Sequence, residues 1–343
     1  MRTVLYARPG EKPHRVEGDE ELTRLYRGGE GCLWVDFQQP GDEDRRALSD
    51  LFRFHRLAIE NCLALCSHPR LEDYGEYLSL TVHAIANPRP GSPEEMDRFL
   101  KALLQEREPG RSAAIRAEEI DVFLGAHALV TWHAGPVAEI EDLRRRTMEV
   151  ESVMDRGPDR ILAELMDGLT EGIAAVVEGL NASIDEIEDR LFKRAARPAF
   201  RQILALKKEM IRFRHLVGPQ REVLHRLGRG EFGVVSKEEA ILFRDVYDRT
   251  YRVFEMLESL RDVLTSALEV YLTVVSNRTN EVVRVLTVFS IILMTAGLIA
   301  GIFGMNFEVI PLARNGAGFY VIVGLMVALV GMLLMLFRRR KWI

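Results

Sequence analysis

Two long uncharged stretches near the C-terminus restrict what this chain can fold into. Residues 285–305 and 315–337 contain no charged side chain, and each stretch, as a helix, can cross a hydrocarbon core of about 30 Å. The mean hydropathy is nevertheless only −0.03, because more polar sequence precedes both stretches. We therefore expect an integral membrane protein with a large soluble part. Residues 1–14 lack the apolar core of a signal peptide.

The charges beside the second stretch predict its orientation. Arg338, Arg339, Arg340 and Lys341 follow it directly, and basic residues favour the cytoplasmic side of a membrane. With two crossings, the N-terminus is then cytoplasmic as well, and residues 307–314 form a short external loop. We expect a bacterial-type inner membrane location, with 338–343 as a basic cytoplasmic tail. The net charge of −5 argues against nucleic acid as a partner.

The soluble part divides into a mixed region and a helical region. Residues 1–135 predict an α+β domain, and residues 136–284 predict helices. In the first region we expect strands at 32–37, 77–83, 120–124 and 129–133 (the last two as a hairpin), helices at 42–54 and 57–65, and a loop over 87–117. In the second region we expect helices at 136–153, 160–192 and 198–226.

The longest expected element joins the soluble part to the membrane. Residues 234–296 contain neither glycine nor proline, and apolar residues recur there at helical spacing. This pattern predicts a single helix from about residue 237 to residue 303, about 100 Å long at 1.5 Å per residue. Residues 237–284 would form a cytoplasmic stalk and 285–306 a first membrane-spanning segment, with 315–337 as the second.

One face of this helix carries polar side chains where a packed helix would carry apolar ones. Steps of four and three residues connect Asp262, Ser266, Glu269, Thr273, Ser276, Asn280, Val283, Thr287, Ser290 and Met294. Inside a membrane, polar positions on one face meet a neighbouring helix or water. The stripe indicates an aqueous path enclosed by several copies, because two spans cannot enclose a pore. For 262–280 alone, the simpler alternative is the solvated face of an amphipathic helix.

Two further patterns suggest other chemistry. Cys62 and Cys66, with His55 and His68 nearby, could suggest zinc, but no second Cys/His pair follows. Buried cysteines on a helix are the favoured interpretation, and cytosolic cysteines, Cys32 included, are not expected to form disulfides.

Residues 228–235 match the glycine-rich loop of protein kinases, Gly-x-Gly-x-x-Gly-x-Val. A kinase also needs flanking strands and two later motifs, His-Arg-Asp and Asp-Phe-Gly. Neither motif follows in this chain, so we expect a turn between two helices.

The tripeptide Gly304-Met305-Asn306, at the outer end of the first span, resembles the signature of the CorA family of divalent-cation (Mg²⁺/Co²⁺) transporters, which includes the ZntB zinc transporters. Further similar segments are Phe243–Asp248, Ser276–Val282, Val285–Thr287, Ile299–Ile302, Phe307-Glu308, Pro311 and the Lys-Trp-Ile ending. The resemblance covers the whole chain in layout. It implies a funnel-shaped homopentamer in the lipid bilayer, with a cytoplasmic α+β domain, long helices, two C-terminal transmembrane helices, no enzyme activity and no organic cofactor.

The resemblance also implies roles along the pore. Five copies of Asn306 would hold hydrated Mg²⁺, which gives up its waters reluctantly. Gly304 would allow close approach and Met305 would pack behind the ring. The implied pore-lining and gate positions are Asn280, Val283, Leu286, Thr287, Ser290, Met294 and Gly297, with Leu286 and Met294 as hydrophobic constrictions. The plainer alternatives are that Asn306 caps a helix, and that Leu286 and Met294 are packing residues.

A regulatory metal site in the cytoplasm is implied as well. In the family, a stalk aspartate and an aspartate of the neighbouring subunit bind Mg²⁺ together. The stalk position matches Asp245, whereas the partner position is Asn61, preceded by Glu60. This departure removes one carboxylate from a site that relies on one or two. Glu269 matches a further acidic position of the stalk.

These patterns predict a channel or transporter for Mg²⁺, with Co²⁺ or Ni²⁺ as further candidates. Asn61 and the absence of an acid after Pro311 leave open a Zn²⁺ transporter of the ZntB type. A membrane-anchored signalling protein or scaffold is the alternative from another class.

Overall fold

The computed structural model describes residues 1–64, 68–85, 117–149, 152–193, 197–305, 316–340 and 342, with the backbone alone for 152, 186–193 and 197–199. The chain divides into two compact units, Met1–Ala267 and Leu268–Ile343. Helix α9 (Lys237–Phe303) contributes to both. The first unit contains the sheet, and the second contains the end of α9 and helix α10 (Gly318–Arg339).

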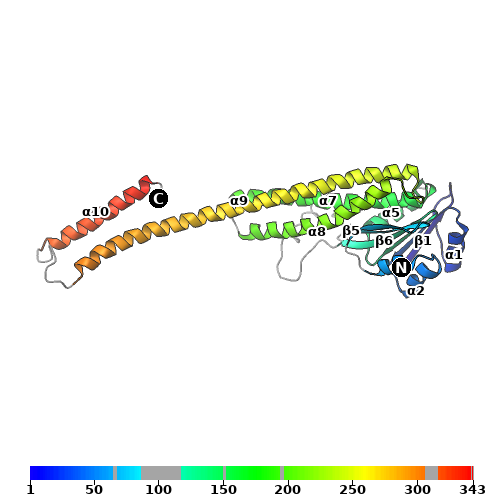
Figure 1. The fold of residues 1–343 in the computed structure, drawn as a ribbon, viewed down its shortest axis with the longest axis horizontal. Coiled ribbons are helices and arrows are strands. Elements are labelled where there is room, and N and C mark those ends of the chain that lie inside the picture. Colours follow the sequence, from blue (N-terminus) through cyan, green and yellow to red (C-terminus); the bar gives the residue numbers. More distant parts are fainter. Residues whose placement is uncertain are drawn as a thin grey trace. The chain divides into compact units, whose positions relative to one another are not determined.

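The first unit is built around a β-sheet (Figure 1). The sheet has seven strands in the order β2-β1-β3-β7-β6-β5-β4. The strands are β1 (Arg2–Ala7), β2 (His14–Arg15), β3 (Cys32–Gln38), β4 (Arg70–Asp73), β5 (Tyr77–Ile85), β6 (Ala117–Gly125) and β7 (Ala128–His133). Strands β3 and β7 pair in parallel, and the other neighbours pair antiparallel. The central strands are buried on both faces, as expected for a sheet covered on both sides.

Helices cover both faces of this sheet. They are α1 (Asp19–Gly28), α2 (Asp42–Asp50), α3 (Arg56–Leu63), α5 (Ala138–Glu149), α6 (Ser152–Asp155), α7 (Pro158–Lys193), α8 (Arg197–Gly228) and the first part of α9. One face, with Trp34 and Val122, shares a core with α5, α7, α8 and the start of α9. The other face, with Val35 and Phe123, shares a core with α1, α2 and α3.

Hydrogen bonds at the start of α9 fasten it to the start of α7. The carboxylate of Asp159 accepts hydrogen bonds from the backbone N–H of Ser236 (2.9 Å) and of Arg160 (3.1 Å). The hydroxyl of Ser236 in turn accepts one from the N–H of Glu239 (3.2 Å), as an N-cap residue does. The long helix is therefore anchored at a defined residue of the first unit.

Most of the elements predicted from the sequence are confirmed. The strands at 32–37, 77–83, 120–124 and 129–133, and the hairpin of the last two, are present. The helices at 160–192, 198–226 and 237–303 are α7, α8 and α9. Residues 229–236 form the turn between α8 and α9, with helices on both sides. This segment therefore lacks the flanking strands that the glycine-rich loop of a protein kinase needs.

Some predicted limits are wrong. The helix expected over 42–54 ends at Asp50, because Arg53 adopts a left-handed conformation (φ 55°) and the chain turns there. The helix over 57–65 is α3, which ends at Leu63. Within the helix expected over 136–153, α5 begins at Ala138 and α6 begins at Ser152, and 150–151 lie outside the described residues.

Four elements of the first unit were not expected from the sequence: β1, β2, α1 and β4. Strand β1 gains its stability from pairing with β3, whose residues lie far along the chain, so no local pattern reports it. The loop expected over 87–117 lies outside the described residues, except Ala117, which begins β6.

A buried carboxyl group on the sheet makes the first unit sensitive to pH. Asp121 of β6 is 5% exposed, and it accepts a hydrogen bond of 2.7 Å from the Thr81 hydroxyl. Burial raises the pKa of Asp121 to about 7, against hydrogen bonds from Thr81 and Cys62 that lower it. Since the unfolded chain has a pKa of about 3.9, the folded unit keeps a proton that the unfolded chain loses. Its stability therefore falls as the pH rises from about 4 to about 7.

Asp121→Asn is expected to stabilise the protein more at pH 8 than at pH 5. Asparagine keeps an oxygen for the Thr81 hydroxyl but carries no charge to bury. Between pH 5 and pH 7 the Asp121 carboxyl is protonated in the folded protein but not in the unfolded chain. Over these two pH units the free energy of unfolding of the unaltered protein falls by about 2–3 kcal/mol. Urea unfolding of both proteins at the two pH values measures the difference. Asp50→Asn, at an exposed position of α2, is the control, and equal gains at both pH values would contradict the argument.

Candidate functional site

The polar side chains of Asn280, Thr287 and Ser290 lie on one face of α9 in the second unit, with apolar residues between them. At 3.6 residues per turn, a sector of about 120° contains Asn280, Val283, Leu286, Thr287, Ser290, Met294 and Gly297. All are exposed in the single chain except Thr287, which is half-buried. Leu286 is 65% exposed and Met294 is 74% exposed. No described residue of the chain covers these two apolar side chains.

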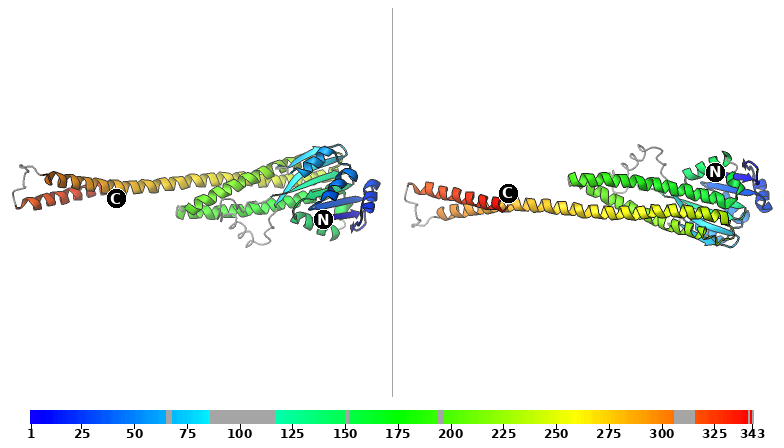
Figure 2. Two further views of the ribbon diagram at one scale, coloured as in Figure 1. Left: turned by 90° about the horizontal axis from the view of Figure 1, so that it is seen from below. Right: turned by 90° about the horizontal axis from the view of Figure 1, so that it is seen from above.

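The opposite face of α9 is the one that the chain itself shields. Val288 is buried there, and Ile292 and Ile299 are half-buried. Helix α10 runs in the opposite direction to this part of α9 (Figure 2), and Phe337 near its C-terminal end is also buried. We infer that α10 covers the back of α9 and leaves the polar stripe open.

The hydroxyl group of Thr287 is oriented by the helix. Its Oγ1 donates a hydrogen bond of 2.8 Å to the carbonyl oxygen of Val283. The proton is thereby directed to the backbone, and the remaining lone pairs of the oxygen are free to accept. Water molecules around a cation point their hydrogens outward, so an acceptor on this face suits a hydrated cation.

Helix α9 ends just before the tripeptide that resembles the family signature. Gly304 follows its last residue, Phe303, and donates its backbone N–H to the carbonyl oxygen of Ala300 (2.9 Å). A Cβ at Gly304 would lie 3.1 Å from that same oxygen, which is tight and favours glycine. Met305 is 49% exposed. Asn306 and the expected external loop lie outside the described residues.

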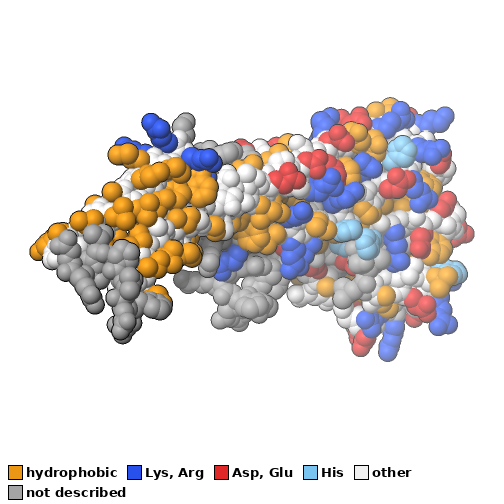
Figure 3. All heavy atoms as spheres, turned by 60° about the vertical axis from the view of Figure 1, so that its left-hand side comes forward, with side chains coloured by type: hydrophobic (Ala, Val, Ile, Leu, Met, Phe, Trp, Pro, Cys, Tyr) orange, Lys and Arg blue, Asp and Glu red, His pale blue; other side chains and the backbone are white. Residues whose placement is uncertain are grey.

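Two helices of the described chain are long and apolar enough to cross a membrane. They are α9 and α10. Only 6% of the most apolar 18-residue segment of α9 is buried, and 0% of that of α10. Figure 3 shows hydrophobic side chains gathered over these helices, whereas charged side chains are spread over the first unit. A continuous exposed apolar surface of this kind needs lipid or another protein copy to cover it.

Asp245, the stalk aspartate at the position of a regulatory ligand in the family, forms an ion pair with an arginine of the same helix. Asp245 accepts a hydrogen bond of 2.9 Å from Arg249, which also pairs with Asp167 of α7 at 2.6 Å. Burial raises the pKa of Asp167, although Arg249 opposes this. The Asp245 side chain is 65% exposed. A cation arriving at Asp245 would therefore compete with the guanidinium of Arg249.

Asn61, the expected partner position of Asp245, lies in α3, and the carboxylate of Glu72 lies next to it. The side-chain amide of Asn61 donates to both carboxylate oxygens of Glu72, at 3.3 and 3.4 Å. Glu72 also accepts a hydrogen bond of 2.8 Å from Tyr74. Glu60, next in the chain, pairs with Arg56 at 2.7 Å. Glu72 was not expected at this position from the sequence, because its strand, β4, has no clear local pattern.

The described residues of one chain form no group of three or more His, Cys, Asp or Glu side chains that could hold a metal ion. Cys62 is buried beside Asp121, and burial raises the pKa of its thiol, which disfavours the thiolate that zinc requires. Cys66 lies outside the described residues. Glu269 is exposed on α9. Asp245 and Glu269 therefore belong to no such group among the residues that the structure describes.

Known proteins resemble this chain over nearly its full length. It is 28% identical to the putative metal ion transporter YfjQ of Bacillus subtilis, over 96% of this chain and 95% of that protein. It is 27% identical to the cobalt/magnesium transport protein CorA of Thermotoga maritima, over 95% of this chain and 87% of that protein. The structure of the CorA magnesium transporter from Methanocaldococcus jannaschii has a TM-score of 0.80 at 23% identity, covering 100% of this chain and 99% of that chain, so the fold is shared.

The family description "CorA-like Mg2+ transporter protein" matches residues 29–339. That range includes most of the sheet, the long helices and both apolar helices. Members of this family are membrane-bound ion transporters and not enzymes. By this match, the chain belongs to the family of CorA-like Mg²⁺ transporter proteins.

Proposed function

We propose that this protein is a homopentameric channel that carries Mg²⁺, and with it Co²⁺ or Ni²⁺, across the inner membrane. The carrying observation is the open face of α9: its polar stripe lies opposite the side that α10 shields. Five copies that face each other through this stripe enclose a path lined by Asn280, Thr287 and Ser290, and α10 lies toward lipid. Both termini then lie in the cytoplasm, since basic residues follow α10.

Selectivity in this proposal lies at the outer end of α9. Five Asn306 amides accept hydrogen bonds from the water shell of Mg²⁺ and leave that shell in place. Gly304 keeps the end of the helix narrow, and Met305 packs beside the ring. The membrane potential supplies much of the driving force, about 4.6 kcal/mol per 100 mV for a double charge.

Gating in this proposal is controlled through the stalk. Mg²⁺ bound between Asp245 of one subunit and the Glu60–Asn61 region of the next holds the pore closed. Glu72, which contacts Asn61, supplies the carboxylate that asparagine lacks. Glu269 adds negative charge further along the stalk.

Transport of Zn²⁺ is the second candidate function, because Asn61 leaves the proposed Mg²⁺-sensing position without one of its carboxylates. A hard cation such as Mg²⁺ prefers carboxylates for a sensing site, and the family resemblance includes zinc transporters. Flux of each ion into proteoliposomes, followed by dye or isotope, separates the two. Entry of Zn²⁺ alone would favour the zinc transporter, and an intact oligomer that moves neither ion would favour a membrane-anchored scaffold.

Ser290→Cys is expected to make Mg²⁺ flux sensitive to a charged, membrane-impermeant thiol reagent. The new thiol lies on the stripe, so the bulky adduct fills the pore. Ile299→Cys, on the shielded face of α9, and the unaltered protein are the controls and keep their flux. The measurement is Mg²⁺ entry into proteoliposomes before and after the reagent. Block of Ile299→Cys with no effect at Ser290→Cys would mean that the other face of α9 lines the path.

A further inference from the structure

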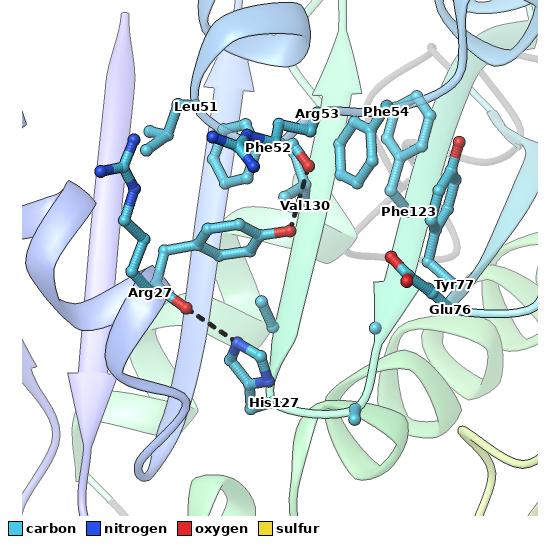
Figure 4. Close-up of a pocket in the computed structure, with 14 residues that line it drawn as sticks. Arg27, Leu51, Phe52, Arg53, Phe54, Glu76, Tyr77, Phe123, His127 and Val130 are labelled. Carbon is cyan, nitrogen blue, oxygen red and sulfur yellow. Dashed lines mark hydrogen bonds between the residues drawn. The ribbon is translucent and has the colours of Figure 1, made fainter.

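A cavity of about 450 Å³ in the first unit has no part in the proposed transport path (Figure 4). It opens between the end of α1, the segment joining α2 to α3, and the turns before β5 and β7. Its volume lies within the range of about 300–1,000 Å³ that small-molecule sites occupy. It suits one ring system with a single charged group.

Aromatic rings form the inner wall of this cavity. Phe54 stacks on Phe123 (4.2 Å between ring centroids, 9° between planes) and on Phe52 (5.4 Å, 9°). Tyr26 meets Phe52 edge to face at 4.9 Å, and Tyr77 tilts against Phe54 at 4.7 Å. The three phenylalanines are buried, whereas Tyr26 and Tyr77 are half-buried. Tyr74 stacks on one face of Tyr77 (5.1 Å, 8°), so only the exposed parts of Tyr26 and Tyr77 are open to a planar ligand.

Two arginines stand at the mouth of the cavity. Arg27 and Arg53 are exposed, and neither forms an ion pair with any residue that the structure describes. Arg53 is held in the left-handed region (φ 55°), which costs a non-glycine residue about 1–3 kcal/mol and is common at ligand sites. That turn places Phe52 and Phe54 inside, with the Arg53 guanidinium at the rim (Figure 4). Guanidinium groups are well suited to phosphate.

The other side of the cavity carries groups of different character. The carboxylate of Glu76 lies next to Tyr77 (Figure 4) and can accept hydrogen bonds from an amine. His127 donates through Nε2 to the carbonyl oxygen of Tyr26 at 3.0 Å, so its Nδ1 is left as an acceptor when the ring is neutral. The Tyr26 hydroxyl is already used, since it donates to the Phe52 carbonyl oxygen (3.3 Å).

We propose that this cavity binds a nucleoside monophosphate. The phosphate pairs with Arg27 and Arg53, the base lies against Tyr26 and Tyr77, and its exocyclic amine donates to Glu76. An anion alone would not use the aromatic wall, and an uncharged ring would leave both arginines unpaired. The site is separate from the transport path, so its occupation can be measured without flux.

Binding of AMP to the full-length protein in detergent, measured by calorimetry, tests the proposal. Adenosine and inorganic phosphate are measured in parallel, and each is expected to bind at least about tenfold more weakly than AMP. Saturation-transfer NMR on the same samples is expected to show the adenine protons in contact with the protein. Equal affinity for inorganic phosphate, or no binding of AMP at all, would overturn the proposal.

The double variant Arg27→Gln/Arg53→Gln is expected to weaken AMP binding about tenfold. Both side chains are exposed, so the fold tolerates the change, and glutamine has the same backbone requirement at residue 53 as arginine. Arg46→Gln, at an exposed position of α2 outside the cavity, removes one charge from the same unit and should leave affinity unchanged. Equal loss in Arg46→Gln and in each single variant would mean that general charge, not this site, attracts the nucleotide.

Discussion

Replacing Asn306 with alanine is expected to reduce Mg²⁺ flux into proteoliposomes to the background of empty vesicles. In a homopentamer the substitution removes the whole ring of amide oxygens at once. Mg²⁺ then reaches the mouth of the pore with no acceptor for its water shell, which it releases reluctantly. A narrow apolar opening also favours drying of the pore. Flux of Mg²⁺, followed by an entrapped dye, is the measurement.

Asn315→Ala provides the matched control for this prediction. It removes the same amide from the start of the second uncharged stretch, where the proposal gives it no role in the pore. Flux close to that of the unaltered protein is expected. If Asn306→Ala also transports Mg²⁺ at the normal rate, the amide ring is not the selectivity element. Size-exclusion chromatography of both variants shows whether the oligomer is retained.

Phe243→Ala is expected to lower the free energy of unfolding of the first unit by about 3–5 kcal/mol. Phe243 is fully buried on α9 and belongs to the same core as Trp34. The substitution removes an aromatic ring from that core and leaves a cavity that its neighbours fill only in part. Urea unfolding followed by tryptophan fluorescence measures the loss, because Trp34 reports on this core.

Ile241→Ala is the control on the same helix. Ile241 is 62% exposed, so its truncation should change the free energy of unfolding by less than about 0.5 kcal/mol. A similar loss in both variants would mean that the helix propensity of this segment, and not the core contact, determines stability. The comparison therefore shows whether the start of α9 is held in place by its contact with the core or only by its own helix propensity.

The sheet shows where sequence patterns are informative and where they are not. The hairpin of β6 and β7 was expected because its strands adjoin a short turn, so a local pattern reports it. Strand β1 and the parallel pairing of β3 with β7 were not expected, since their partners lie far along the chain. The same reason applies to Glu72, which reaches Asn61 only because β4 pairs with β5.

The same distinction between local patterns and long-range contacts applies to the candidate pore. The sequence by itself determined the two apolar helices, the uninterrupted helix over 237–303 and the periodic stripe, because hydropathy, the absence of glycine and proline, and spacing are local properties. Only the tertiary structure decided which face of α9 the chain shields, since that depends on α10. It also brought Arg27, Arg53 and the aromatic side chains to one cavity, because contacts between distant segments follow from packing and leave no periodic pattern in the sequence.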